Sequence, residues 1–263
     1  MPSSDAVLLE TPSDGVRLIT LNRARIRNAI TLELTEAYRE VLDDVSTDDS
    51  VRAVVITGAG SSFCAGADLS WLDIGNSASG TPDRIRSKLR STYDTWLTPR
   101  KLSMPVVAAI NGPAIGAGVC VALACDLRYC STDSVLSTPF LHLGTHGGMG
   151  VTHLLPDAVG VTRAREMLYT GRTVSAATAV EWGLVNGAHD DVVEHSIDVA
   201  TRIAEAAPIA TRFTKTGLDR SRHDLEAAVE WELLAQPVTM ATQDIHEGIA
   251  AKRQGRRPAF RGN

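Results

Sequence analysis

Two nearly unbroken apolar runs, VRAVVITG at residues 51–58 and VVAAI at residues 106–110, constrain the fold of this chain more than any other feature. Strands that are apolar at successive positions must be covered on both faces, which is typical of parallel sheets with helices above and below. Small residues and then a helical pattern follow each run. This alternation of strand and helix predicts an α/β fold with right-handed crossovers.

The rest of the N-terminal half fits the same architecture. Residues 7–23, VLLETPSDGVRLITLNR, predict two strands around a Ser-Asp-Gly turn, and residues 30–48 carry apolar side chains close to helical spacing. Further strands are expected in DLRYCS at 126–131 and VLSTP at 135–139, and a helix is expected from about Ala117. These elements give the α/β core its remaining strands.

From Gly147 onward the strand signal disappears and helical patterns dominate. No Pro/Ser linker separates the two parts, so we predict one domain, with an α/β core at 1–190 and a C-terminal helical extension at 191–263. The Gly- and Ser-rich stretch 74–82 is either a surface loop or a lid over a pocket. Helices are expected around residues 150–158, 162–169, 175–182, 191–206, 208–219, 224–235 and 243–253.

Charge and composition exclude several classes of function. The formal net charge of −5, without a basic block outside residues 252–263, gives no footprint for nucleic acid. The N-terminus lacks the basic and apolar segments of a signal peptide, so the expected location is cytoplasmic. The uncharged run 104–125 is long enough to span a bilayer, but Asn111-Gly112-Pro113 divides it into a strand and a helix, so no membrane partner is expected.

The four cysteines, at 64, 120, 125 and 130, form no C-x-x-C pair, and the last three stand in apolar runs. A thiol in such surroundings usually packs as a small hydrophobic group. We therefore expect neither a disulfide nor a metal site.

Two loops rich in small residues follow the two apolar strands: GAGSSFCAGADL at 58–69 and NGPAIGAG at 111–118. Ligands of open α/β sheets bind at the carboxyl ends of the strands, where helix starts present unpaired N–H groups. Neither loop has the third glycine or the G-K-[ST] of a phosphate motif, and the chain has no G-x-S-x-G. Two convergent N–H groups would suit an oxyanion, such as the enolate of a polarised thioester. Alternatively, the small residues only permit tight packing of helix on sheet.

Several segments together resemble the crotonase superfamily, the enoyl-CoA hydratase/isomerase family. They follow in the family's order over nearly the whole chain, which makes the resemblance specific. It implies a repeated ββα core with a C-terminal helical region. The matching segments are NRARIRNAI at 22–30, VRAVVITGAGSSFCAGADL at 51–69, MPVVAAINGPAIGAGVCVALACDLR at 104–128, LGTHGGMG at 143–150, LLPDAVGVTRAREMLYTGRTVSAATAVEWGLVN at 154–186 and RRPAF at 256–260.

The resemblance implies a role for individual residues. The oxyanion donors would be the backbone N–H groups of Ala67 and Ala117. Coenzyme A would lie against Ala65, with the segment around Arg25 near its phosphates and Arg27 as a further candidate; the other reading of the two arginines is a solvated surface. Asp68 is placed beside this site as well, although it could instead cap the following helix.

Hydratases of the family use two glutamates to position water and deliver a proton. The corresponding positions here are Cys120 and Phe140, so both carboxylates are missing. We interpret Cys120 as a buried packing residue. The candidate replacements for acid–base chemistry are His142 and His146, because an imidazole titrates near neutrality; alternatively they are ordinary turn histidines.

Two functions remain open from the sequence. The first is an enzyme of fatty acyl-CoA metabolism that acts on a 2-enoyl-CoA thioester, as a hydratase-like lyase or an isomerase, with coenzyme A entering as part of the substrate and no separate cofactor. The alternative is an acyl-CoA-binding protein without turnover, which Phe140 favours because a ring excludes water. A caseinolytic-type serine protease would need a serine that the glycine-rich turns lack. The resemblance also implies a homotrimer or hexamer, and the apolar residues of EWELLAQPV at 230–238 fit a face buried either in an assembly or within the chain.

Overall fold

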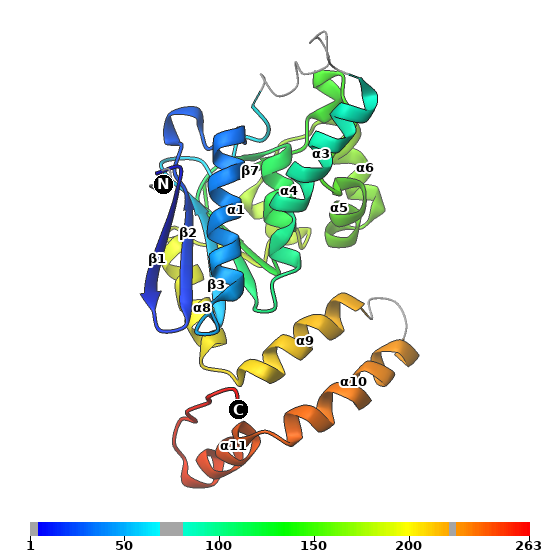
Figure 1. Ribbon diagram of the computed structural model, residues 1–263. Helices are drawn as coiled ribbons and strands as arrows, with labels where there is room; N and C mark the ends of the chain where they lie inside the picture. Colours follow the sequence, from blue (N-terminus) through cyan, green and yellow to red (C-terminus); the bar gives the residue numbers. More distant parts are fainter. Residues whose placement is uncertain (1–4, 69–80, 221–224) are drawn as a thin grey trace.

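The computed structural model describes residues 5–68, 81–220 and 225–263, and its centre is a six-stranded sheet (Figure 1). The strand order is β1-β2-β3-β4-β6-β9, in which β1 and β2 are antiparallel and every later pair is parallel. The parallel α/β core predicted from the apolar runs is therefore confirmed. The strands are β1 (Val7–Ser13), β2 (Val16–Leu21), β3 (Ala53–Gly58), β4 (Val106–Ile110), β6 (Leu127–Cys130) and β9 (Gly187–Ala188).

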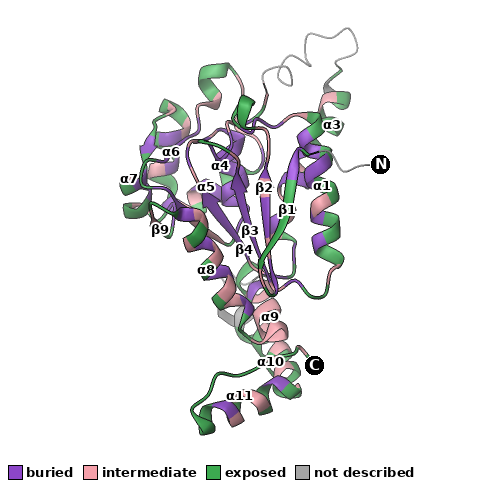
Figure 2. Cartoon of the chain, turned by 90° about the vertical axis from the view of Figure 1, so that its left-hand side faces the viewer, coloured by how far each residue is buried: buried purple, intermediate pink, exposed green. Residues whose placement is uncertain are grey.

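Helices cover both faces of this sheet, which explains the unbroken apolar strands. All six residues of β3 are buried: Val54 and Ile56 face one core cluster, and Ala53 and Val55 face the other. The first cluster includes side chains of α1 (Leu32–Thr47), α3 (Pro82–Trp96) and α4 (Ala117–Leu123), while α8 (Val192–Ala204) packs on the opposite face (Figure 2). Alternate residues of a strand point to opposite faces, so each face of β3 needs its own apolar partner.

A small second sheet lies beside the first and contains β5 (Ala114–Ile115), β7 (Val135–Ser137) and β8 (Val174–Ser175). The expectation that no strand follows Gly147 is wrong, because β8 pairs with β7 and β9 pairs with β6. Each of these two late strands has only two residues. A run that short shows no alternation in the sequence, and it becomes a strand only because a neighbour is present to pair with it.

The helical character of the C-terminal part is confirmed. Helix α3, by contrast, was not predicted. Charged and other polar residues together occupy most of its positions, although Ile85, Leu89, Tyr93 and Trp96 supply an apolar side at helical spacing. None of the helices formed by the described residues is long and apolar enough to cross a membrane. The remaining helices are η1 (Ala24–Ile26), η3 (Thr98–Arg100), η4 (Phe140–Leu143), α5 (Val151–Val159), α6 (Val161–Thr170), α7 (Ala176–Glu181), α9 (Pro208–Arg220), α10 (Leu225–Met240) and α11 (Gln243–Gln254).

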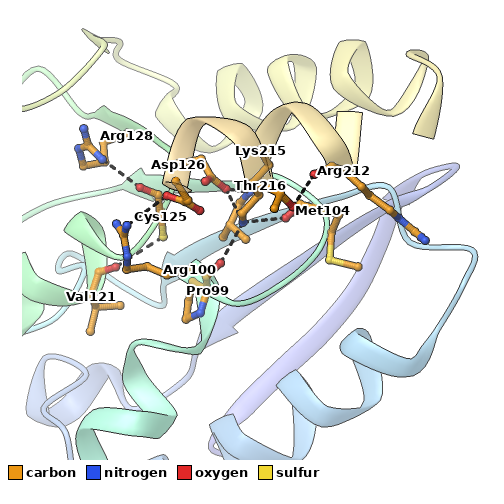
Figure 3. A network of polar contacts seen from close by, with 12 residues as sticks. Pro99, Arg100, Met104, Val121, Cys125, Asp126, Arg128, Arg212, Lys215 and Thr216 are labelled. Atoms are coloured by element: carbon orange, nitrogen blue, oxygen red, sulfur yellow. Dashed lines mark hydrogen bonds and ion pairs between the residues drawn. The ribbon is translucent and has the colours of Figure 1, made fainter. Parts of the chain in front are cut away.

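Helices α9 to α11 extend away from the sheet, as Figure 1 shows, and a buried lysine attaches α9 to the body. The Lys215 ammonium donates to the carbonyl oxygens of Pro99 and Met104 at 3.1 and 3.0 Å and to Asp126 Oδ2 at 2.8 Å (Figure 3). Only 7% of the Lys215 side chain is exposed. A buried charge is costly unless it is paired and hydrogen-bonded, and these three acceptors meet that requirement. A cavity of about 1180 Å³ lies beside this attachment, between the body and α9–α10.

Candidate functional site

The two loops that follow β3 and β4 are joined through their backbones. Cys64 and Ala114 form a parallel bridge, and the Ile115 N–H donates to the Cys64 carbonyl at 2.9 Å. A Cβ added to Gly66 would lie 2.6 Å from the Ile115 oxygen and 3.3 Å from the Ala117 nitrogen. The turn before Ala67 and the start of α4 are therefore in direct contact, as expected for strand ends at the same edge of a sheet.

At this contact, the N–H groups of Ala67 and Ala117 have no acceptor among the described residues. Ala117 is the first residue of α4, so the helix supplies no carbonyl for its N–H. Ala67 bridges Ile30, but the hydrogen bonds of that bridge run from Ile30 to the Gly66 carbonyl and from Asp68 to the Ile30 carbonyl. Ala67 is exposed and Ala117 is 8% exposed, so both donors lie at the edge of a largely buried turn.

The glycines of the two loops meet two different structural requirements, close packing and a positive φ. A Cβ on Gly118 would lie 2.2 Å from the Cys64 carbonyl oxygen, so this residue permits close packing, as the alternative interpretation proposed. Gly66 and Gly116 have φ of +91° and +55°, and each directly precedes one of the unpaired N–H groups. A side chain is strained in that conformation. Small residues are therefore required in these loops both by close packing and by the backbone conformation of the turns.

Two asparagines that the sequence analysis did not identify hold the first loop. Asn28 is fully buried; its amide donates to the carbonyls of Ala59 and Ser62, at 3.0 and 2.8 Å, and its oxygen accepts the Arg23 N–H at 2.9 Å. Asn111 accepts the Gly58 N–H at 3.1 Å and donates to the carbonyls on either side of Ala59. The Asn-Gly pair at 111–112 signals a turn, but the partners of these side chains follow only from the tertiary structure.

The segment with the two candidate arginines runs along the first loop. The Ala65 N–H donates to the Arg27 carbonyl at 3.0 Å, and the side chains of Arg25 and Arg27 are both exposed. Ala65 is half-buried. This places two guanidinium-bearing residues beside the loop that holds one of the unpaired N–H groups. Asp68 is half-buried next to Ala67, and the helix it was expected to cap falls in 69–80, outside the described residues, as do residues 74–80 of the Gly- and Ser-rich stretch.

Cys120, which the resemblance aligns with one of the two glutamates, is fully buried in α4. Its Sγ lies 3.5 Å from the Gly116 carbonyl oxygen and 3.6 Å from the Gly148 carbonyl oxygen. Burial raises the pKa of the Cys120 thiol to about 12, with a smaller effect from the Cys64 thiol. The thiol therefore stays protonated at neutral pH, as the packing interpretation requires.

Phe140, which the resemblance aligns with the other glutamate, stands at the start of η4. Its ring carbons lie 3.8 and 3.9 Å from the place where a Cβ on Gly116 would be, and 3.6 Å from the corresponding place on Gly147. The ring thus spans the distance between the start of α4 and the turn at 147–148. It presents an apolar surface between these two segments.

The two candidate histidines are exposed. The His142 ring is turned toward Gly171, at the end of α6, with Cε1 2.8 Å from the Cβ position of that glycine. His146 lies in the turn between η4 and α5. No hydrogen bond among the described residues joins either imidazole to Ala67 or Ala117, and their role in catalysis stays a prediction.

Tyr93 of α3 is a further titratable group near this region, and it belongs to a helix that was not among those expected from the sequence. Its Oη lies 2.2 Å from the Cβ position of Gly148, so a side chain at 148 would collide with it. Burial raises the pKa of the phenol, a hydrogen bond from the Met149 backbone opposes this, and the Cys120 thiol adds to the rise. The phenol therefore faces the same turn that Cys120 and Phe140 contact.

The mainly parallel α/β core, with helices on both faces and a small second sheet, is a crotonase-type fold. Residues 11–263 match the profile of the family described as "Enoyl-CoA hydratase/isomerase", and the chain belongs to this family.

Named relatives agree with that assignment. The Mycobacterium tuberculosis protein "Probable enoyl-CoA hydratase EchA12" is 36% identical over 271 residues, which cover 97% of this chain and 92% of the relative. The Arabidopsis thaliana "Probable enoyl-CoA hydratase 2, mitochondrial" is 31% identical over 97% of this chain and 84% of its own length. The crystal structure of an enoyl-CoA hydratase from Bacillus anthracis superposes with a TM-score of 0.91 at 34% identity, covering 98% of this chain and 100% of the other.

Proposed function

We propose that this protein acts on a fatty acyl-CoA thioester of the 2-enoyl type, whose carbonyl oxygen accepts hydrogen bonds from the N–H groups of Ala67 and Ala117. The observation that carries the proposal is that both donors lack an acceptor among the described residues while their loops are in contact at Gly66. An enolate oxygen would satisfy both donors. Preorganised backbone donors contribute on the order of 3 kcal/mol each when charge develops on such an oxygen.

The coenzyme A portion lies, in this proposal, along the first loop. Ala65 and Asp68 adjoin the oxyanion donors, and the exposed side chain of Arg25 is available to phosphate oxygens, with Arg27 beside it. The hydrogen bond between Ala65 and Arg27 supports this arrangement, because it fixes the arginine segment to the loop. No metal or separate cofactor enters the proposed chemistry.

The enolate can serve several reactions, and the side chains limit which of them is efficient. A buried protonated thiol at 120 and a phenyl ring at 140 can neither activate water nor accept a proton at neutral pH. Isomerisation or another proton transfer next to the thioester therefore fits the site better than hydration, with His142 and His146 as candidate proton carriers.

Binding without turnover is the second candidate function, and Phe140 specifically favours it. The ring covers the start of α4, where water would have to approach a bound enoyl group. An apolar surface in this place extends the wall of an acyl-chain pocket.

One experiment separates the two functions. The purified protein is mixed with a short 2-enoyl-CoA, the absorbance of the conjugated thioester is followed, and the heat of binding is measured in parallel. The first function predicts binding together with a change in absorbance. Binding with constant absorbance supports the second, and absence of binding contradicts both.

We further propose that the chain assembles as a homotrimer or hexamer. Core packing within the chain does not explain the apolar residues of α10, because Leu233, Leu234 and Val238 are 62%, 69% and 48% exposed. Exposed apolar residues gathered on one helix are typical of a protein contact surface.

A further inference from the structure

We infer that the Tyr93 hydroxyl is the proton donor to the enolate carbon, in place of the missing carboxylates. This inference rests on the proposed function, because it needs a thioester held at Ala67 and Ala117. It assigns a chemical role to a helix that lies outside both strand-end loops.

Two side chains, Cys120 and Phe140, connect the turn beside Tyr93 with the Ala117 donor. Cys120 Sγ approaches the carbonyls of both Gly116 and Gly148, and the Phe140 ring lies against both Gly116 and Gly147. Gly116 directly precedes the Ala117 donor, and the Tyr93 Oη lies against Gly148. The Cys120 thiol and the Phe140 ring therefore contact both the segment that carries the Ala117 donor and the turn that carries Gly148, against which the phenol lies.

Of Tyr93, Cys120 and Phe140, the phenol of Tyr93 is the group best suited to donate a proton. The Cys120 thiol is fully buried and already directed at two carbonyls, and a phenyl ring carries no proton to transfer. Tyr93 is half-buried rather than fully buried, and its hydroxyl is the one O–H group among these three side chains. Because its pKa is raised, chiefly by burial, the phenol keeps its proton at neutral pH and is suited to act as an acid.

The step balances without any further reactant. The O–H bond of Tyr93 breaks as a C–H bond forms at the enolate carbon, and the electron pair of the enolate makes the new bond. The negative charge moves from the thioester oxygen to the phenol oxygen, and a proton from water restores the phenol. In the reverse direction the phenolate removes the α-proton of a bound acyl-CoA, which exchanges that proton with solvent.

Exchange in heavy water is the direct test. Wild-type protein and a Tyr93→Phe variant are incubated with butyryl-CoA in D₂O, deuterium at the α-carbon is measured by mass spectrometry, and calorimetry gives the Kd. Loss of a positioned acid–base group lowers the rate by roughly 10²- to 10⁴-fold. We expect a fall of at least about 100-fold in Tyr93→Phe with the Kd within about threefold.

A matched control and a second variant test the same role. Tyr169→Phe removes a hydroxyl from a side chain that is 67% exposed on α6, and it should leave exchange unchanged. Replacement of Tyr93 by 3-fluorotyrosine makes the phenol more acidic, so the pH at which exchange stops rising should move to lower pH. The neighbouring titratable group, Cys120, is the same in both proteins, so the shift reports on residue 93.

The outcomes separate this inference from the proposed function. If wild-type protein binds butyryl-CoA and exchanges its α-proton, and Tyr93→Phe exchanges it at the same rate, the role of Tyr93 is overturned. The proposed function then stays intact. Loss of exchange in His146→Ala, with Tyr93→Phe unaffected, overturns it in favour of the imidazole. Wild-type protein that does not bind butyryl-CoA overturns the proposed function and this inference with it.

Discussion

The candidate site has two halves that differ in what they contribute. One half is backbone: the N–H groups of Ala67 and Ala117, at the ends of two buried strands. The other half consists of the side chains of Cys120, Phe140 and Tyr93, which come from three different elements. The backbone half offers the two donors that the proposed enolate would use, whereas the three side chains of the other half include no carboxylate.

The difference shows that the fold and the reaction depend on separate parts of the sequence. The backbone donors exist because parallel strands end beside each other and glycines at 66 and 116 permit the turns. They persist whatever side chain stands at 120 or 140. The acid–base group, by contrast, depends on single side chains, so family membership alone does not determine the reaction.

The largest effect is expected from Ala117→Pro, which breaks the backbone half. Proline deletes the N–H, and it is tolerated at the first position of a helix, which is the position Ala117 has in α4. Loss of one oxyanion donor costs about 10²- to 10³-fold in turnover. Steady-state kinetics with the acyl-CoA substrate found in the binding experiment would measure this.

Ala117→Gly is the control for that variant, because it keeps the N–H and changes only the backbone freedom. We expect it to retain turnover within about tenfold, since the donor remains. The two variants should also unfold at similar urea concentrations. Equal turnover in Ala117→Pro and wild type would contradict the role of this donor.

The second-largest effect is expected on stability, and it tests the backbone half through the loop that carries the Ala67 donor. Asn28→Ala leaves the carbonyls of Ala59 and Ser62 and the Arg23 N–H without their buried partner, and places alanine at φ +54°. We expect the free energy of unfolding to fall by about 3 kcal/mol, from three lost hydrogen bonds and the left-handed backbone.

Urea unfolding would measure the cost, with Asn22→Ala as the matched control. Asn22 is half-buried and its amide donates to one carbonyl, that of Asp5, so the expected cost is about 1 kcal/mol or less. Affinity for acyl-CoA should weaken in Asn28→Ala but not in Asn22→Ala, because only the former holds the loop of Ala67. Similar costs in the two variants would show that Asn28 does not hold the loop.

The sequence predicts the backbone half of the site better than the side-chain half, for a physical reason. Apolar strands and small-residue turns are local patterns, and the requirement to bury both faces of β3 and β4 follows from them directly. The resemblance then places the two donors at Ala67 and Ala117, and the structure leaves both N–H groups without an acceptor among the described residues.

The rest depends on contacts between segments far apart in the chain. Ile85, Leu89, Tyr93 and Trp96 recur at helical spacing, so the sequence does carry a signal for α3, but Tyr93 meets Gly148 only after α3 and the turn before α5 have packed. Similarly, the sequence shows Asn28 as one polar residue among arginines, while its three partners come from other parts of the loops. Strands β8 and β9 form only because β7 and β6 are present to pair with them.

The smallest effect on turnover is expected from Cys120→Ala, which tests whether the side-chain half includes this thiol. A buried protonated thiol that only packs should leave turnover within about threefold, and the lost volume should cost about 1 kcal/mol of stability. The presence of the Cys120 thiol should instead be visible in how the free energy of unfolding depends on pH. The ordinary thiol pKa of 9.0 is raised by burial to about 12 in the folded protein, so the folded state retains a proton that the unfolded state loses.

The stabilising contribution of the thiol is therefore full below about pH 9 and is lost as the pH rises toward 12. Each such thiol lowers the free energy of unfolding by up to about 1.4 kcal/mol per pH unit in this range. Urea unfolding between pH 8 and about pH 10.5 should give a shallower decline for Cys120→Ala than for wild type, because the variant lacks one thiol to titrate. An identical decline, or a large loss of turnover at neutral pH, would show that Cys120 is more than a wall of the site.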